Sequence, residues 1–157
     1  MRILGPNHIQ TGEVHMDYAR LQLQKSEKDK FSSKSLQQKN DSLQHFIEAF
    51  NIFKNYFESE KLEALQTAEA AILIAKLMEA EGRLEEAFDY AQVASKTYQH
   101  VFAEDNPLII KAMWKELSIA YAIGYDETEN LAADLFYALA KRDYIMQIGD
   151  IQTFERY

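Results

Sequence analysis

Apolar residues recur every three to four positions along most of the chain, and no segment alternates strictly between apolar and polar residues. The first pattern is typical of amphipathic helices and the second of half-buried strands, so the sequence predicts an all-α protein. We expect six helices, at about residues 9–25, 41–58, 62–81, 84–103, 107–123 and 127–148. Asn106 followed by Pro107 marks one start, because Asn caps a helix and Pro fits its first turn.

One spacing of small and aromatic residues occurs three times in the chain. Each copy places residues at i, i+4 and i+7, which is one face of a helix. The copies are Ser42, Phe46 and Ala49, then Ala87, Ala91 and Ala94, then Ala133, Tyr137 and Ala140. Their first residues are 45 and 46 positions apart, from 42 to 87 to 133. This near-constant period indicates a repeat protein, in which small residues let paired helices approach closely.

Two glycines mark the corners inside these repeats. Gly82 and Gly124 each follow the predicted first helix of a pair. A tight corner after a helix needs a residue that tolerates positive φ, which glycine does without steric cost. We therefore expect both residues to end helices in the left-handed conformation.

The repeated unit resembles the tetratricopeptide repeat (TPR), in particular the long form found in kinesin light chains and clustered-mitochondria proteins. Residues 4–8 (LGPNH) and 104–107 (EDNP) stand where that form has its linkers, and residues 18–21 (YARL) follow the first. The resemblance implies an all-α, right-handed solenoid of about three antiparallel helix pairs. It divides a TPR-like domain (1–148) into repeats at about 4–58, 62–103 and 107–148, followed by a C-terminal tail at 149–157.

Residues 25–40 (KSEKDKFSSKSLQQKN) interrupt the first predicted pair. The segment is rich in Ser and Lys and poor in apolar residues, so it is expected to be a flexible, solvated insertion. A second interpretation is a regulated tether for an acidic partner, in which phosphorylation of Ser32, Ser33 or Ser35 cancels the basic charge.

Composition excludes several classes of function. The 157 residues are 47% hydrophobic, which is too many for a disordered chain, and no run of apolar residues is long enough to span a membrane. The net charge of −8 disfavours nucleic acid and anionic membranes as partners. We expect a cytoplasmic protein, held at a cytoskeletal or organelle surface only through a partner.

Catalytic and metal-binding patterns are missing from the sequence. There is no cysteine, the five glycines never cluster, and no nucleophile motif occurs. The histidines at positions 8, 15, 45 and 100 are scattered, and only His8 and His15 are close enough in sequence to share a helix face. The sequence therefore predicts a non-catalytic protein with no cofactor and no metal site.

The TPR resemblance also implies a ligand groove, lined by the first helix of each pair. In the three repeats its positions hold Met16, Arg20 and Gln24; Glu69, Ile72, Lys76 and Glu79; and Lys111 and Trp114. Trp114 has a second interpretation as a core residue, because a lone Trp usually packs inside. Kinesin light chains bind Trp-acidic peptides through grooves rich in Lys and Arg. Acidic residues interleave the basic ones here, so the sequence argues against the same ligand.

Three functions remain open from the sequence. The leading one is a TPR adaptor or scaffold, or a subunit of a large multiprotein complex, which binds a protein or peptide through its groove or its apolar end. That end comprises Tyr144, Ile145, Met146, Ile148, Ile151, Phe154 and Tyr157, which could also fold back as a cap. The second is a purely architectural subunit, docked laterally. The third is a regulatory lobe, because residues 5–12 and 18–23 are similar to the helical lobe of SET-and-MYND methyltransferases.

Overall fold

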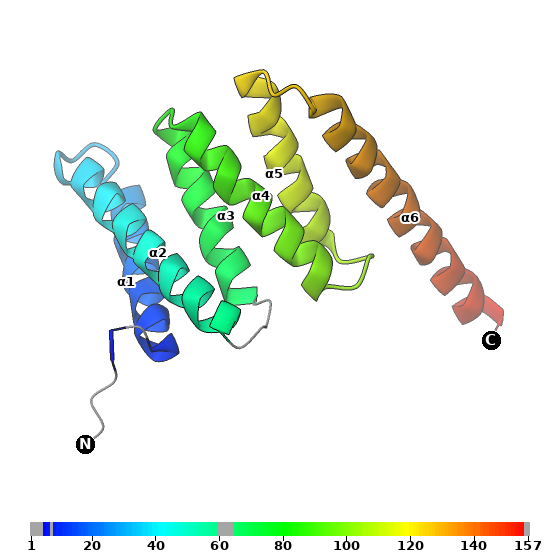
Figure 1. Cartoon of the computed structure of the whole chain (residues 1–157), viewed down its shortest axis with the longest axis horizontal. Helices are drawn as coiled ribbons and strands as arrows, with labels where there is room; N and C mark the ends of the chain where they lie inside the picture. Colours follow the sequence, from blue (N-terminus) through cyan, green and yellow to red (C-terminus); the bar gives the residue numbers. More distant parts are fainter. Residues whose placement is uncertain (1–4, 7, 60–64, 156–157) are drawn as a thin grey trace.

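The computed structural model describes residues 5–6, 8–59 and 65–155, and within this part of the chain it contains helices and no strand. The helices are α1 (Ile9–Lys28), α2 (Lys34–Ser59), α3 (Leu65–Ala80), α4 (Leu84–Val101), α5 (Pro107–Ile123) and α6 (Thr128–Glu155). Each helix packs against the next one in the chain (Figure 1). The predicted all-α helical-repeat solenoid is confirmed.

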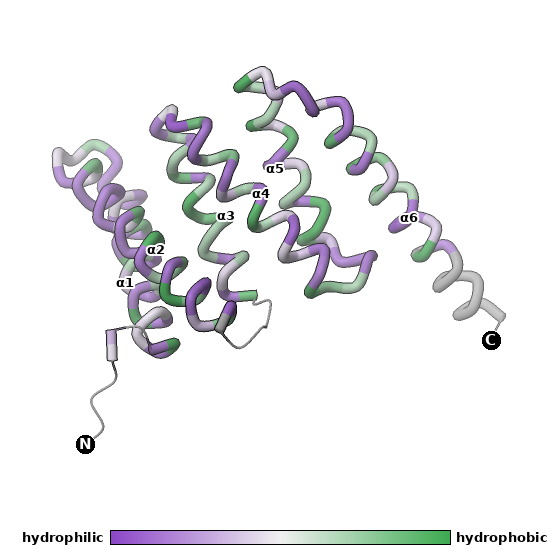
Figure 2. Tube along the Cα trace, in the orientation of Figure 1, coloured by the Kyte–Doolittle hydropathy of each residue, from purple (hydrophilic) through white to green (hydrophobic). Residues whose placement is uncertain are grey.

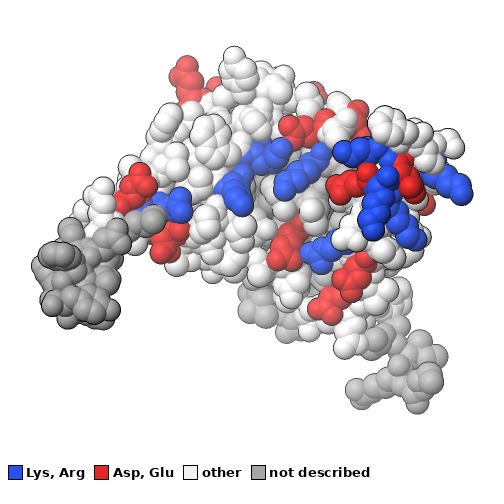
Figure 3. All heavy atoms as spheres, turned by 180° about the vertical axis from the view of Figure 1, so that it is seen from behind, with Lys and Arg blue, Asp and Glu red and all other residues white. Residues whose placement is uncertain are grey.

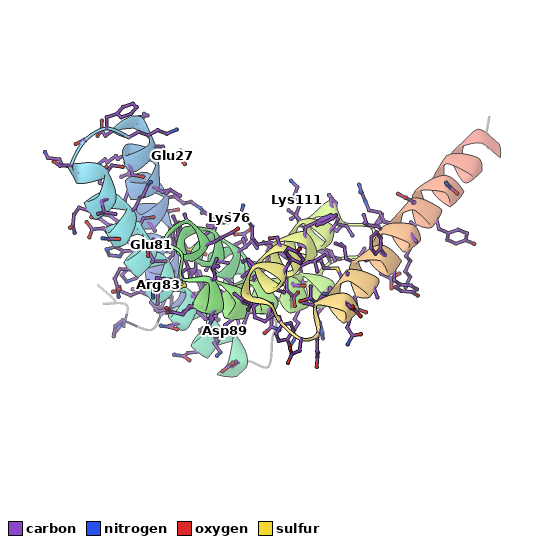
Figure 4. All side chains as sticks on the ribbon, turned by 90° about the horizontal axis from the view of Figure 1, so that it is seen from above. Glu27, Lys76, Glu81, Arg83, Asp89 and Lys111 are labelled. Carbon is purple, nitrogen blue, oxygen red and sulfur yellow. The ribbon has the colours of Figure 1, made fainter. Side chains whose placement is uncertain are left out.

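The helices form two layers in a curved array. Seen from above, α1, α3 and α5 line the concave side, while α2 and α4 lie on the convex side (Figure 4). The inner helices α3 and α5 carry many of the hydrophobic positions, since each lies between two neighbours (Figure 2). Among the described residues, no helix has the length and hydrophobicity that a membrane span requires.

Local signals account for the helix ends. Asn106 caps α5, because its side-chain oxygen accepts from the Leu108 backbone N–H at 2.9 Å, and Pro107 is the first helical residue as predicted. Gly82 and Gly124 have φ of 79° and 68°, which confirms the two predicted left-handed corners. The backbone N–H of the residue after each glycine donates to a carbonyl of the preceding helix, which helps to satisfy the carbonyl groups at the helix end.

The core confirms two of the three repeated faces. The faces at 42/46/49 and 87/91/94 are fully or almost fully buried between helices. The third prediction is wrong, because Ala133, Tyr137 and Ala140 are exposed. Helix α6 instead turns the same spacing, two positions earlier, toward α5: Leu131, Leu135 and Ala138. This face is entirely aliphatic, whereas burial of the predicted face would also bury the Tyr137 hydroxyl, which costs free energy unless it is hydrogen-bonded.

The predicted insertion at 25–40 is also wrong in extent, because only residues 29–33 lie outside the helices. Buried serines hold this end of the first pair together. The Ser35 hydroxyl donates to the Ser26 carbonyl at 3.1 Å, and the Ser42 hydroxyl donates to the Ala19 carbonyl at 2.8 Å. Because these buried hydroxyls are hydrogen-bonded to backbone carbonyls, this polar segment forms packed helix instead of a loop. Ser35 is only 7% exposed, so a kinase would not reach it in the folded chain.

The C-terminal prediction changes as well. Helix α6 continues through Glu155, so residues 149–155 form no separate tail and do not fold back as a cap (Figure 1). Of the sequence features, Leu4, Asn7, the start expected at 62–64 and Tyr157 lie outside the described residues.

Candidate functional site: the concave face

A band of basic side chains crosses the concave face. Figure 3 views this face, and Lys and Arg atoms follow one another across its middle, with acidic groups between some of them. Figure 4 shows that Lys76 of α3 and Lys111 of α5 point toward the concave side, whereas Asp89 of α4 lies on the opposite side. The helix layer predicted to carry the groove therefore does face the concave side.

A small cavity of about 100 Å³ lies between α3 and α5 at the centre of this band. Its apolar part is formed by Ile72, Leu108 and Ala112, together with the ring of Tyr98. Burial raises the pKa of Tyr98 above its ordinary value, so this side chain adds no charge to the cavity. The cavity thus offers a hydrophobic floor on which a ligand side chain could rest.

Three ammonium groups, those of Lys76, Lys111 and Lys115, surround this floor. Lys115 is already paired, because its Nζ lies 2.7 Å from a carboxylate oxygen of Glu79. Lys76 and Lys111 are exposed, and neither makes an ion pair with any residue that the structure describes. Two positive charges are therefore left uncompensated on an acidic protein.

A second cavity, of about 280 Å³, lies where α1 meets α3. Arg20 lines it, with its guanidinium 3.9 Å from Asp17 and 3.7 Å from Glu69. Glu13 and Gln66 complete the polar rim, so three carboxylates face one guanidinium and this end of the face carries a net negative charge. Arg20 consequently offers less net charge to a partner than the lysines of α3 and α5.

The predicted groove residues differ in how much of each residue is exposed to solvent. Arg20, Gln24, Lys76, Lys111 and Trp114 are exposed, and Glu69, Ile72 and Glu79 are half-buried. Met16 is only 4% exposed and packs in the core, so it offers little surface to a partner. Trp114 is 51% exposed, which places it on the surface of α5 rather than in the core.

Aromatic side chains continue beyond the groove onto the last helix. Phe136 and Tyr137 of α6 are each 68% exposed, and Tyr144 is 63% exposed. A cavity of about 350 Å³ separates this part of α6 from α4 and α5. Lys141 bridges across it to Glu104 at 2.6 Å, and this hydrogen bond raises the pKa of Lys141. The apolar end is thus exposed at Tyr144, while the side chains of Met146 and of residues 148–157 are outside the described part.

One cluster was missed by the sequence reasoning, which expected scattered histidines. His15 of α1 and His45 of α2 lie with their Nδ1 atoms 2.8 Å apart, and Glu48 reaches the same place. The predicted neighbours were His8 and His15, but His8 serves as the cap of α1, where its Nδ1 accepts from the Gln10 backbone N–H. The contact could not be found from periodicity, because it joins two helices across 30 positions.

Comparison with known proteins adds no relative to this description. No protein-family profile matches the chain, and no curated protein is significantly similar to it in sequence. In the described part of the chain, the geometry establishes a six-helix repeat solenoid with a band of basic side chains on its concave side.

Proposed function

We propose that the chain is a non-catalytic interaction module of the TPR type, a cytoplasmic adaptor or complex subunit whose concave face binds an acidic segment of a partner protein. The observation that supports this most is the exposed pair Lys76 and Lys111, which lacks acidic partners among the described residues and flanks an apolar cavity. Carboxylates of a partner would supply the missing charges, and an apolar side chain between them would occupy the floor.

The expected energies favour this central site over the end near Arg20. An exposed ion pair contributes about 0.5–1 kcal/mol, and a buried aliphatic side chain contributes about 1.5–3 kcal/mol. Arg20 must first separate from Asp17 and Glu69, which offsets what it gains from a new carboxylate. Lys76 and Lys111 have no such contact to break with any described residue, so they are the better test positions.

The proposal is tested by affinity co-purification with mass spectrometry, using the wild type and Lys76→Glu/Lys111→Glu. A matched control is Lys39→Glu/Lys54→Glu, which changes the total charge equally but alters exposed lysines of α2, outside the concave layer. We expect a partner that the groove variant loses and the control retains. The captured acidic segment, made as a labelled peptide, should then bind at least roughly tenfold more weakly to the groove variant.

The architectural alternative predicts a different result. If a stoichiometric complex survives the groove variant but is lost when Phe136 and Tyr137 are changed to Ser, the chain is docked through α6. Both residues are more than half exposed, so these changes should leave the fold intact. That outcome would remove the groove from the mechanism.

A further inference from the structure

Three potential metal ligands converge on the α1–α2 pair. The Nδ1 atoms of His15 and His45 are 2.8 Å apart, and an oxygen of Glu48 lies 3.3 Å from the Nδ1 atom of His15. All three ligand atoms lie within 4.8 Å of one another. The side chains of His15 and Glu48 are 24% and 42% exposed, so an ion could reach the cluster from solvent.

No placement of protons gives all three groups a well-matched hydrogen-bond partner. If His45 donates from Nδ1 to His15, then the lone pair of His15 is used and the carboxylate of Glu48 faces a nitrogen with no proton. If His15 donates instead, one N–H must serve both His45 and Glu48. If both imidazoles are charged, two positive groups lie 2.8 Å apart at the nitrogens. A cation can interact with all three acceptors at once.

We propose that His15, His45 and Glu48 form a binding site for a divalent transition metal ion, with Zn²⁺ as the best match. Two imidazole nitrogens and one carboxylate are a donor set that Zn²⁺ takes with a fourth position open to water. Tetrahedral ligands at zinc distances stand about 3.3 Å from one another. The His15–Glu48 spacing already has this value, and the two nitrogens need to separate by only about 0.5 Å.

The three ligands come from two different helices. His15 belongs to α1, whereas His45 and Glu48 are one turn apart on α2, so a bound ion would tie the two helices of the first pair. The Tyr18 ring packs on His45 in an edge-to-face contact, with centroids 4.4 Å apart, and helps to hold that imidazole in place. Since the native state binds the ion and the unfolded chain lacks the assembled site, binding should raise the melting temperature.

The test is a titration of the purified, chelator-treated full chain with Zn²⁺, followed by isothermal calorimetry and thermal melting. We expect one equivalent to bind and the melting temperature to rise with zinc concentration. His15→Ala and His45→Ala should each weaken binding at least about tenfold and abolish the thermal shift. His100→Ala, which removes a histidine from α4, is the matched control and should keep the zinc affinity and the zinc-dependent thermal shift of the wild type.

Two further measurements keep the proposal open to refutation if a histidine variant fails to fold. Glu48→Gln preserves the shape of a partly exposed side chain, so it should fold and still bind zinc more weakly. Co²⁺ in place of Zn²⁺ should give the visible absorption of a four-coordinate nitrogen–oxygen site, and this band should need a higher Co²⁺ concentration to develop in Glu48→Gln. Absence of saturable binding, or binding that is unchanged in His15→Ala and Glu48→Gln, would overturn the site and leave a hydrogen-bonded histidine pair.

Discussion

Gly12 lies near the start of α1 and offers the sharpest test of how the first helix pair is packed. Replacing a glycine by alanine inside a helix normally stabilises it by about 0.5–1 kcal/mol, since the backbone of the unfolded chain loses freedom. The structure opposes this gain. A Cβ added at Gly12 would lie 2.7 Å from Cε1 and 3.1 Å from Cδ1 of Phe53, and 3.2 Å from the Cγ2 atom of Ile52.

The size of the opposing effect follows from the burial of the ring. Phe53 is only 1% exposed, so it can relieve the contact only by moving its ring toward the cavity that it lines between α1 and α3. Overpacking of this kind costs about 1–3 kcal/mol, which exceeds the gain in helix propensity. We therefore expect Gly12→Ala to destabilise the chain by about 1 kcal/mol and to lower its melting temperature by roughly 2–4 °C.

Urea unfolding followed by far-ultraviolet circular dichroism measures this change, and a double-mutant cycle identifies its cause. Phe53→Leu removes the outer atoms of the ring, so Gly12→Ala should cost less in that background. We expect a coupling energy of at least about 0.5 kcal/mol between the two changes. If Gly12→Ala stabilises the otherwise wild-type chain, or if the coupling energy is near zero, the close α1–α2 contact is refuted.

Three further changes test other parts of the fold. Burial raises the pKa of Glu116 in α5, against the smaller effect of a hydrogen bond with Ser95, so the folded state favours the protonated form more than the unfolded chain does. This contribution to stability is present below the unfolded pKa and is lost as pH rises through the folded one, so Glu116→Gln should raise the melting temperature at pH 7 and flatten its pH dependence. Gly124→Ala should lower the free energy of unfolding by about 1–2 kcal/mol, because an L residue is strained at the φ of 68°. The added Cβ would meet no neighbouring group within 4 Å, so the loss comes from φ alone. Gly124→Asn should therefore cost less, as measured by urea titration. Ser42→Ala removes the 2.8 Å hydrogen bond to the Ala19 carbonyl and should cost about 1 kcal/mol in urea unfolding.

The parts of the fold that the sequence predicts are those with a local physical signature. Gly82 and Gly124 mark corners because a single residue type tolerates the required φ, and Asn106 with Pro107 marks a helix start. The period of about 45 residues predicts the solenoid, since each pair must bury its apolar face against the next. These signals need no knowledge of which helix lies where.

Polar residues between 25 and 42 show where local reasoning fails. Ser and Lys in succession indicate a loop, but the structure buries Ser26, Ser35 and Ser42 between two helices. Their hydroxyls donate to backbone carbonyls, which removes the cost of burying them. For Ser35 and Ser42 the acceptor lies on α1, so it is present only in the correct register of α1 against α2, and periodicity within one helix does not contain that information.

The same limit explains the site residues. The predicted groove residues include three bases and two acids, which suggest a nearly balanced surface when they are only counted, and the total charge of −8 suggests that an acidic partner would be repelled. The structure distributes the acids unevenly: Glu69 lies beside Arg20, and Glu79 beside Lys115, which leaves Lys76 and Lys111 without a described acidic partner. Nearby ion pairs determine the local electrostatic potential more than the net charge of the chain does, because salt screens the interaction between exposed charges that are more than about 10 Å apart. An acidic ligand is therefore compatible with an acidic protein, provided that it binds between α3 and α5.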